Sequence, residues 1–443
     1  MKLTLIGGGG FRVPGVYEAI ASDDAPVRID ELVLHDVSQS RLDTIHAIVD
    51  ALAPRFQHPP RVTTSTDLAE ALAGTDFVFS AVRIGGSAGR VADEHIALAE
   101  GVLGQETVGP GGLAYALRTL PFMMTVAETV RDVAPDAWVI NFTNPAGIVT
   151  EAMRAVLGDR VIGICDTPIG LMRRALQAVG GAAGGEVTFD YVGLNHLGWL
   201  RSVSVDGKDL LPRLLASDEA LESIEEARLV GFDWVRALGA LPNEYLFYYY
   251  FAREARERIR SSDETRGQFL DRQQSAFFAD PGDDPLVAWQ RTLHERESSY
   301  MAESREQDEE RHAEDVDGGG YQKVALDLMA ALATGRPATM ILNVGNGSLV
   351  PELPADAVVE VGCRVDGDGV HPLPIAPVST EMLGLMAPVK AAERQIIAAA
   401  REGSRDRAWR AFAAHPLVDS IAVAKRLVEA YRARFPEIDE LLG

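Results

Sequence analysis

The first 165 residues alternate short apolar runs with stretches of helical periodicity. The apolar runs are KLTLI, ELVLHD, RVTTST, TDFVFSAV, AWVIN and RVIGI. Strands that alternate with helical segments are typical of a parallel sheet, because each crossover between parallel strands needs a connection about as long as a helix. We therefore predict a doubly wound α/β domain over residues 1–165.

The segment LTLIGGGGFRVPGVYEAI indicates a strand, a glycine turn and a helix. Glycines allow close approach of a pyrophosphate, and the free N–H groups of a helix N-terminus favour its charge. The second strand ends at Asp36, where a carboxylate would bind ribose hydroxyls and favour NAD over NADP. The alternative is a purely structural turn in which Asp36 caps the next helix. The dinucleotide hypothesis is a Rossmann-type NAD site with these contacts: Gly7, Gly9, Gly10, Phe11, Arg12 and Asp36.

The alternation of apolar runs and helical stretches ends after Pro168. An extended passage, VTFDYVGLNHLGWLRSVSVDGKDL, is followed by mainly helical sequence with strand-like insertions near 339–344 and 357–363. We predict a second, α+β domain over residues 166–443 whose strands continue the first sheet. Residues 292–316 are rich in charge and poor in apolar anchors, which favours a solvated helix or a loop. The helical tail, about 376–436, could pack on the core or form a subunit contact.

The composition of the chain limits the kinds of molecule that it can bind. The formal net charge of −23 would repel nucleic acid, although arginines gathered in one cleft could still bind a small anion. No apolar stretch reaches the length of a membrane span, and the N-terminus runs directly into a strand. The two cysteines match neither a disulfide framework nor a zinc motif, so we expect a cytoplasmic protein with no membrane and no nucleic-acid partner.

Polar residues follow three predicted strands. Asn144 lies in NFTNPAG, Cys165 and Asp166 in GICDTP, and Asn195 and His196 in GLNHLGW. The carboxyl ends of parallel strands form the ligand-binding edge of an open sheet. A thiolate and an imidazole there could supply half of a divalent-metal site, whereas an isolated cysteine and histidine are usually core residues.

Aromatic residues gather in LPNEYLFYYYF, where a helix would place Tyr245 on one face with Tyr248 and Tyr249. Most of these rings are expected to pack. One tyrosine could act as a base if nearby cations lowered its pKa from about 10.

Together, IGGGG, RIGGSAGRVADEH, GVLGQETVGPGG, NFTNP, GICDTP, GLNHLGW and PNEYLFYYY resemble glycoside hydrolase family 4, the NAD- and metal-dependent phosphoglycosidases. The resemblance runs in order over nearly the whole chain. It implies a dinucleotide-binding domain joined to a lactate/malate dehydrogenase-like second domain, in a homodimer or homotetramer.

The resemblance also assigns roles to individual residues. Cys165 and His196 look like the metal ligands, usually of Mn²⁺, and Tyr245 looks like the catalytic base. Asn144 resembles a substrate contact beside the nicotinamide, so we expect it to contact both cofactor and substrate, and we expect Asn195, in the same group of loops, to contact the substrate. Two arginines, Arg90 in AGRVADEH and Arg266 in DETRG, look like ligands of a sugar 6-phosphate. The sequence departs from the family at Gly10, Phe11 and Arg12, where the family often has GGGS followed by Thr, Ser or Tyr.

The implied reaction is a redox elimination rather than hydrolysis by two carboxylates. NAD⁺ takes hydride from carbon 3 of the glycone, Tyr245 removes the acidified proton from carbon 2, the aglycone leaves, water adds, and the hydride returns. In family members that act on 6-phospho-α-glucosides, an aspartate after the cysteine looks like the acid, so Asp166 favours α. The stretch GLNHLGWLRSVSVDGKDLLP and the compact tail resemble 6-phospho-β-glucosidase-like members, and we favour β.

Two other classes remain open at this point. A simple NAD-dependent hydroxy-acid dehydrogenase would form NADH stoichiometrically, whereas the hydrolase would form no net NADH. A non-catalytic NAD-binding sensor would cleave no glycoside.

Overall fold

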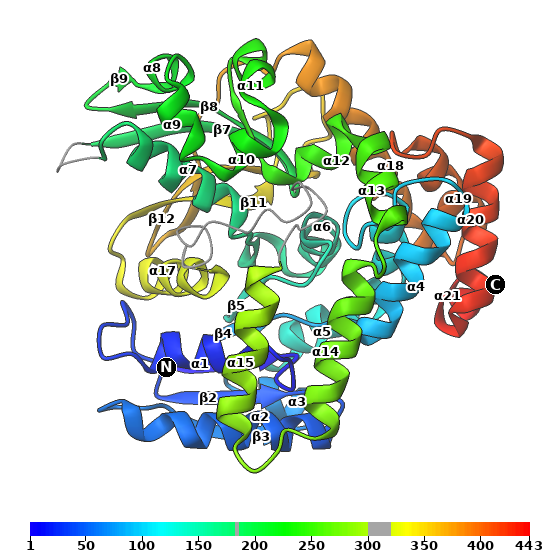
Figure 1. The fold of residues 1–443 in the computed structure, drawn as a ribbon. Helices are drawn as coiled ribbons and strands as arrows, with labels where there is room; N and C mark the ends of the chain where they lie inside the picture. Colours follow the sequence, from blue (N-terminus) through cyan, green and yellow to red (C-terminus); the bar gives the residue numbers. More distant parts are fainter. Residues whose placement is uncertain (182–185, 300–319) are drawn as a thin grey trace.

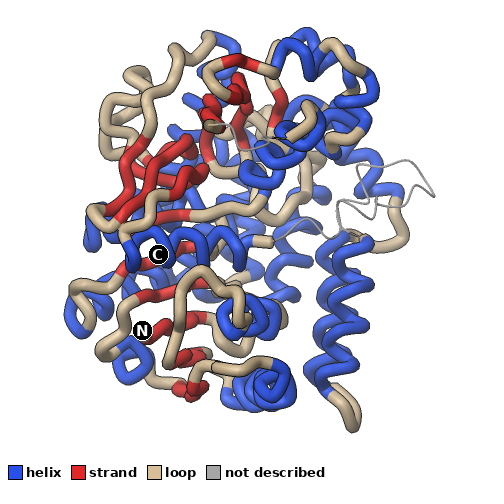
Figure 2. The backbone as a smooth tube through the Cα atoms, turned by 90° about the vertical axis from the view of Figure 1, so that its left-hand side faces the viewer, coloured by secondary structure: helices blue, strands red, loops and turns tan. Residues whose placement is uncertain are grey.

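The computed structural model describes residues 1–181, 186–299 and 320–443. Within these ranges thirteen strands form one sheet that runs through the molecule from the N-terminal half to the second half (Figures 1 and 2). The strands are β1 (Lys2–Ile6), β2 (Glu31–His35), β3 (Arg61–Ser65), β4 (Phe77–Ser80), β5 (Trp138–Asn141), β6 (Val161–Gly163), β7 (Val187–Leu194), β8 (Leu197–Val205), β9 (Lys208–Asp209), β10 (Leu241–Pro242), β11 (Ala338–Gly345), β12 (Val358–Asp366) and β13 (Gly369–Pro372).

Helices cover both faces of this sheet and form a separate group at its side. The α-helices are α1 (Val13–Ala21), α2 (Gln39–Leu52), α3 (Leu68–Leu72), α4 (Gly86–Ala99), α5 (Pro110–Val133), α6 (Ala146–Leu157), α7 (Thr167–Ala178), α8 (Leu211–Leu215), α9 (Asp218–Glu222), α10 (Glu225–Val230), α11 (Phe232–Leu238), α12 (Phe247–Tyr250), α13 (Ala252–Ser261), α14 (Arg266–Ala279), α15 (Pro285–Ser298), α17 (Tyr321–Thr334), α18 (Thr380–Glu402), α19 (Arg405–Ala414), α20 (Ile421–Arg434) and α21 (Pro436–Leu442). Short 3₁₀ turns are η1 (Ala53–Arg55), η2 (Gly158–Arg160) and η3 (Glu244–Leu246).

The N-terminal half is the predicted doubly wound sheet. Its six strands are parallel in the order β3-β2-β1-β4-β5-β6. Successive residues of a strand face opposite sides, so Leu5 of β1 packs with α1 and α2, while Ile6 packs with α3, α5 and α6. The inner strands therefore bury both faces, which explains their continuous hydrophobic segments, whereas the edge strand β3 is only half-buried.

The second half extends the same sheet with antiparallel strands. Strand β11 pairs with β6 through Asn343 and Gly163, and β12, β7, β8 and β10 follow in that order. A Cβ atom at Gly163 would lie 2.7 Å from that of Asn343, so glycine permits the close approach at the junction. The predicted boundary at residue 165 falls between β6 and α7, and the sheet continues across it, as expected.

Two groups of helices from the second half pack on the first. In Figure 1, α14 and α15 stand in front of the N-terminal sheet, where α14 contacts α4 and α15 contacts α2. The tail helices α18–α21 pack on α4 and α5, and Tyr431 donates to the carbonyl of Asp93 at 3.0 Å. Two roles were expected for the tail, packing on the core or a subunit contact. The structure shows that it packs on the core.

The first residues of the charged segment 292–316 form a helix, which was one of the two expected structures, but this helix is only partly exposed to solvent. Residues up to Ser298 belong to α15, where Thr292 is buried and Arg296 faces a cavity. Residues 300–319 lie outside the described ranges. Among the described residues, no helix is long and apolar enough to cross a bilayer.

Candidate active site

A cavity of about 780 Å³ lies along the carboxyl ends of the parallel strands. It extends from the glycine turn after β1 to the loops after β5 and β6, and helices α4, α14 and α15 line its other side. Of the residues proposed from the sequence, it is lined by Gly7, Gly10, Phe11, Arg12, Asp36, Arg90, Asn144, Cys165, Asp166, Asn195, His196, Tyr245 and Arg266. Gly9 lies behind the wall, where its N–H donates to Asp36 Oδ2 at 3.1 Å.

The glycine turn packs so closely on neighbouring backbone that its first positions have no room for a side chain. Gly7 has a φ of +91°, and a Cβ atom there would lie 2.5 Å from the carbonyl oxygen of Ala81. The N–H groups of Gly7 and Gly8 both donate to the carbonyl of His35, at 2.9 and 2.7 Å. The turn is therefore fixed to the end of β2, which fits the backbone cradle that a pyrophosphate needs.

Asp36 lies directly after β2 at the same end of the cavity. Its carboxylate accepts from the N–H groups of Gly9 at 3.1 Å and Ser38 at 3.0 Å. The helix-cap alternative does not hold, because Ser38 is the N-cap of α2 and accepts from the N–H of Arg41. Asp36 is thus oriented by two backbone donors beside the turn, as a ribose-binding carboxylate would be.

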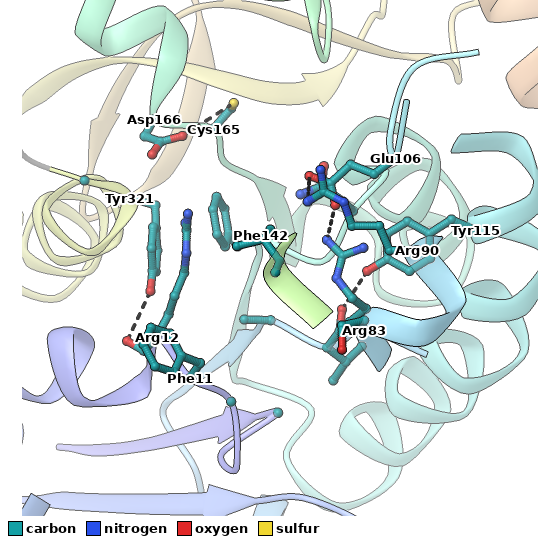
Figure 3. Close-up of a pocket in the computed structure, with 18 of the residues that line it drawn as sticks. Phe11, Arg12, Arg83, Arg90, Glu106, Tyr115, Phe142, Cys165, Asp166 and Tyr321 are labelled. Atoms are coloured by element: carbon teal, nitrogen blue, oxygen red, sulfur yellow. Dashed lines mark hydrogen bonds and ion pairs between the residues drawn. The ribbon is translucent and has the colours of Figure 1, made fainter. Parts of the chain in front are cut away.

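Two residues that are distant in the sequence donate hydrogen bonds to the backbone that follows this turn. Trp289 Nε1 donates to the carbonyl of Phe11 at 2.8 Å, and the Tyr321 hydroxyl donates to that of Arg12 at 3.3 Å. The Arg12 side chain runs beside the Tyr321 ring, 5.3 Å from its centroid (Figure 3). Sequence reasoning missed Trp289 and Tyr321 because a tryptophan or tyrosine in a helical stretch looks like an ordinary core residue.

The loop after β5 contains two asparagines with different roles. Asn141 is fully buried, where its Oδ1 accepts from Ser80 and its Nδ2 donates to Thr150 at 3.0 Å. Asn144 lines the cavity, and its buried Oδ1 has no hydrogen-bond partner among the described residues. A buried acceptor without a donor is costly, so Asn144 is suited to a ligand that supplies one.

Cys165 and Asp166 follow β6 at the opposite end of the cavity from Asp36. Cys165 Sγ lies 3.4 Å from the hydroxyl oxygen of Thr167 and 4.0 Å from Oδ1 of Asp166. Burial, followed by the carboxylates of Asp166 and Glu360, raises the pKa of the Cys165 thiol. A cation at this position would reverse that balance and favour the thiolate.

His196 occupies the tight turn between β7 and β8, with a φ of +63°. Its ring stacks on Tyr245 with centroids 3.7 Å apart and planes 5° apart, and its Nδ1 lies 3.1 Å from the Thr107 hydroxyl oxygen. Burial lowers the pKa of His196 to about 4, which keeps the imidazole neutral. A neutral imidazole and a buried sulfur facing one cavity suit a divalent transition metal.

No group of three or more histidine, cysteine, aspartate or glutamate side chains suited to a metal occurs among the described residues. Cys165 and His196 would therefore form half of a coordination sphere, and oxygen atoms of water or ligand would complete it.

The aromatic segment adopts a broken helix rather than one continuous face. Tyr245 lies in η3 and its ring centroid is 6.1 Å from that of Tyr248, which also lines the cavity. Tyr249 turns away and stacks on His415 at 6.2 Å. The expected three-tyrosine face is thus reduced to Tyr245 and Tyr248.

Asn195 is held by a buried carboxylate that sequence reasoning also missed. Glu360 accepts from Asn343 Nδ2 at 2.8 Å, from the Tyr191 hydroxyl at 3.0 Å and from Asn195 Nδ2 at 3.4 Å. Burial raises the pKa of Glu360 to about 7 despite these three donors. It sits within a strand, β12, where an isolated glutamate gives no sequence signal of burial.

Arginines line the side of the cavity formed by α4 and the loop that follows it. Arg90 pairs with Glu94 at 2.8 Å and with Glu106 at 2.9 Å, and Arg83 pairs with Glu106 at 2.5 Å (Figure 3). Burial opposes ionisation of Glu106, but the guanidiniums of Arg83, Arg90 and Arg296 outweigh it and lower its pKa to about 2. This wall is a desolvated network of fixed charges.

Glu94 also helps to place Arg90 and Arg266, the two predicted phosphate ligands, on the same side of the cavity. Its Oε2 accepts from the N–H of Gly267 at 2.9 Å, which ties the N-terminus of α14 to α4. Arg266, the first residue of α14, consequently lines the same cavity as Arg90. The structure therefore brings every predicted site residue except Gly9 to the lining of one cavity, and Gly9 donates to Asp36, which lines it.

Models of two known protein families match this chain over most of its length. The family 4 glycosyl hydrolase model matches residues 2–180, and the model of the family 4 glycosyl hydrolase C-terminal domain matches residues 191–418. The chain belongs to glycosyl hydrolase family 4. The resemblance of its motifs is thereby confirmed, and so is the Rossmann-type fold with its added second domain.

Several family 4 relatives match the chain over nearly its whole length. A maltose-6'-phosphate glucosidase of Bacillus subtilis is 30% identical, with 99% of this chain and 97% of the relative covered. A 6-phospho-β-glucosidase of Escherichia coli is 28% identical, with 100% and 98% covered. Other relatives of similar identity are named 6-phospho-α-glucosidases, so the names of the relatives include both anomeric specificities.

Solved family 4 structures have the same architecture. A 6-phospho-β-glucosidase from Thermotoga maritima with NAD and glucose-6-phosphate superposes with a TM-score of 0.83 at 28% identity and 99% coverage of both chains. A 6-phospho-α-glucosidase from gut microorganisms, in complex with NAD and Mn²⁺, gives 0.81 at 26% identity, with 98% of this chain and 97% of that one covered. A malate dehydrogenase from Plasmodium falciparum shares the fold alone, with a TM-score of 0.51, 13% identity and coverage of 91% and 99%.

Proposed function

We propose that the protein hydrolyses 6-phospho-β-glucosides by an NAD-dependent redox elimination with a divalent metal, Mn²⁺ being the ion found in neighbouring structures. The observation that carries this proposal is the single cavity that joins the glycine turn and Asp36 to Cys165, His196 and Tyr245. A glycosidase without a redox step would not need the first group, and a dehydrogenase that uses no metal would not need the thiol and imidazole of the second group.

The residues that would hold the two cofactors are well suited to them. Gly7 and Gly10 would face the pyrophosphate and Asp36 the adenosine ribose, and Cys165 with His196 would hold the metal. When bound, NAD⁺ would accept and return a hydride, and the metal would draw electrons from the sugar oxygens.

The remaining steps belong to side chains of the protein. Tyr245 would take the proton from carbon 2 of the glycone, and its stacking on His196 keeps it within the site of the proposed metal ligand. Asn144 Oδ1 would accept from a sugar hydroxyl, which would satisfy its buried lone pairs. Asn195 would be fixed toward the substrate by Glu360, while Arg90 and Arg266 would face the phosphate.

The 6-phospho-α-glucosidase is the second candidate, because Asp166 lines the cavity next to Cys165 and could protonate the leaving oxygen. The proposed β preference is supported by the resemblance of GLNHLGWLRSVSVDGKDLLP and the tail to 6-phospho-β-glucosidase-like members. The deciding experiment supplies the pure protein with NAD⁺, Mn²⁺ and a reductant, and compares 4-nitrophenyl 6-phospho-β- and α-glucosides side by side. Faster cleavage of the α-anomer would replace the first proposal by the second.

Nicotinamide absorbance during the same assay separates hydrolase from dehydrogenase. Catalytic NAD⁺ with no net NADH supports the redox elimination, whereas stoichiometric NADH would indicate an ordinary dehydrogenase. Absence of any glycoside cleavage would leave only NAD binding and contradict the enzyme proposal.

A further inference from the structure

Residues 105–109, QETVG, form the loop that leads into α5. This loop packs directly on the first turn of the helix. A Cβ atom at Gly111 would overlap the carbonyl oxygen of Gln105, and one at Gly112 would overlap that of Thr107. Glycine at both positions lets the two segments touch backbone to backbone. The side chains of the loop therefore project from a backbone that is fixed by α5.

The side chain of Gln105 is buried and folds back on its own loop. Its Oε1 accepts from the N–H groups of Thr107 at 2.6 Å and Val108 at 2.7 Å. Since both donors are backbone N–H groups, the atom that faces them must be the amide oxygen, which fixes the direction of the amide. The Thr107 hydroxyl lies 3.2 Å from the same oxygen. Because an amide oxygen can only accept, this hydroxyl is the donor.

The direction of that hydrogen bond determines which nitrogen of His196 carries a proton. Thr107 Oγ1 lies 3.1 Å from His196 Nδ1. The single hydroxyl proton of Thr107 is used toward Gln105, so its oxygen has only lone pairs to offer and Nδ1 must be the donor. Burial lowers the pKa of His196 to about 4, so the ring is neutral and carries one proton. With that proton on Nδ1, the lone pair of Nε2 is available to a divalent cation.

The imidazole of His196 is also fixed in orientation. Its face stacks on Tyr245 with centroids 3.7 Å apart, and its backbone has a φ of +63° in the turn between β7 and β8. This φ is uncommon for a residue with a side chain, and it sets the direction in which the ring leaves the backbone. Thr107 is not among the residues that line the cavity. Its influence on a ligand would therefore pass through His196.

We infer that Thr107 is a positioning residue which, together with Gln105, fixes His196 in the tautomer that carries its proton on Nδ1 and presents Nε2 to the metal. This inference rests on the proposed function and deepens it, since it names the residues that prepare one of the two proposed metal ligands before any metal binds. It also gives the motif GVLGQETVGPGG a role in the metal site, because its glycines fix the loop that holds Gln105 and Thr107.

Nitrogen-15 NMR of protein labelled at histidine reads the tautomer without metal and without turnover. The chain has nine histidines, and the signals that are missing from His196→Ala identify His196. We expect a protonated Nδ1 and an unprotonated Nε2 in the unchanged protein. In Thr107→Val the proton should move toward Nε2, because a methyl group cannot accept a hydrogen bond. A proton on Nε2 in the unchanged protein would overturn the inference.

Titration of Mn²⁺ by electron paramagnetic resonance measures the consequence for the proposed metal site. Thr107→Val should raise the Kd of Mn²⁺ by about 10- to 100-fold, as the loss of a partner of a metal-binding imidazole does. Thr107→Ser keeps the hydroxyl and should restore most of the affinity. A serine variant that binds as weakly as the valine variant, or a valine variant that binds as tightly as the unchanged protein, would contradict the role of the hydroxyl.

A second threonine provides the matched control. Thr119 is fully buried in α5, where its hydroxyl donates to the carbonyl of Tyr115 at 2.8 Å. Thr119→Val removes a buried hydroxyl in the same way and should bind Mn²⁺ like the unchanged protein. An equal loss of Mn²⁺ affinity in Thr119→Val and Thr107→Val would assign the effect to general destabilisation and overturn the inference.

Activity separates this inference from the proposed function. If the unchanged enzyme binds no Mn²⁺ or cleaves neither phosphoglucoside, the proposed function fails, whereas the NMR measurement still supports or overturns the tautomer of His196. In an enzyme that cleaves the substrate, Thr107→Val should lower activity at limiting Mn²⁺ and recover part of it at high Mn²⁺. A loss that excess Mn²⁺ leaves unchanged would contradict a role through the metal ligand.

Discussion

The two ends of the cavity are built in different ways. The dinucleotide end is formed by one short segment, in which backbone N–H groups, a glycine with positive φ and Asp36 are fixed by neighbours in sequence or in the adjacent strand. The end proposed to bind the substrate is assembled from side chains on α4, α14, α15, the loop after β6 and the β7–β8 turn, and several of them are charged and at least half-buried. The first end should therefore be sensitive to added atoms, and the second to removed functional groups.

The largest expected effect is at the substrate end. Cys165→Ser or His196→Ala should lower kcat/KM by at least about 100-fold and weaken Mn²⁺ binding, because each removes one of the two proposed protein ligands. Titration of free Mn²⁺ by electron paramagnetic resonance measures the binding without any assay of turnover.

The other cysteine provides the matched control for this prediction. Cys363 is fully buried in β12 and donates to the carbonyl of Val361 at 3.5 Å. Cys363→Ser should change stability and leave Mn²⁺ binding intact. Equal Mn²⁺ affinity in Cys165→Ser and the unchanged protein would remove Cys165 from the metal site.

At the dinucleotide end, adding one methyl group should have nearly as large an effect. In Gly7→Ala the new Cβ would meet the Ala81 oxygen at 2.5 Å in a backbone conformation with φ of +91°. We expect the Kd of NAD⁺ to rise by about 100-fold and the free energy of unfolding to fall by about 2 kcal/mol or more. Gly15→Ala, in α1 with no atom within 4 Å of its Cβ position, should be neutral or slightly stabilising. If both variants bind NAD⁺ equally, the turn is not the pyrophosphate site.

A smaller effect is expected from Asp36→Asn, which keeps the shape of the side chain and removes its charge. The Kd of NAD⁺ should rise by about 10-fold and discrimination against NADP⁺ should weaken, since a carboxylate repels the 2′-phosphate. Asp43→Asn on the exposed face of α2 is the control. Discrimination that stays unchanged in Asp36→Asn would assign the ribose contact to another group.

The smallest effect on ligand binding is expected at Glu360. Its protonation should instead make the stability of the fold depend on pH. Its folded pKa of about 7 exceeds that of an exposed glutamate, so the folded state holds the proton more tightly. The contribution to stability is present at low pH and is lost as pH rises through about 7, by about 1–3 kcal/mol. Glu360→Gln should flatten this decline between about pH 5 and 8 in urea unfolding, while the Kd of NAD⁺ stays unchanged. A parallel pH dependence in both proteins would contradict the assignment.

The glycine turn and the position of Asp36 could be predicted from the sequence, because they lie in one motif and at the end of the next strand. Trp289 and Tyr321, which donate to the backbone of Phe11 and Arg12, could not. The alternation of apolar runs predicted the six parallel strands. At the substrate end the motifs identified residues that follow strands, such as Cys165 and His196, but not those that helices bring in. Arg296 lies in a stretch whose charge resembles a solvated helix, and only the packing of α15 on α2 decides that this arginine is desolvated. Glu360 and Trp289 were missed for the same reason, since burial depends on contacts between distant segments.

The sheet that runs without interruption from β3 to β10 has a consequence for how the molecule can be divided. One hydrophobic core contains Leu5 and Phe79 from the first half together with Trp199 and Leu342 from the second. A fragment ending after β6 would expose both the unpaired edge of that strand and half of this core, as would the complementary fragment at β11. Separate expression of the two halves should therefore yield aggregating chains rather than an isolated NAD-binding module.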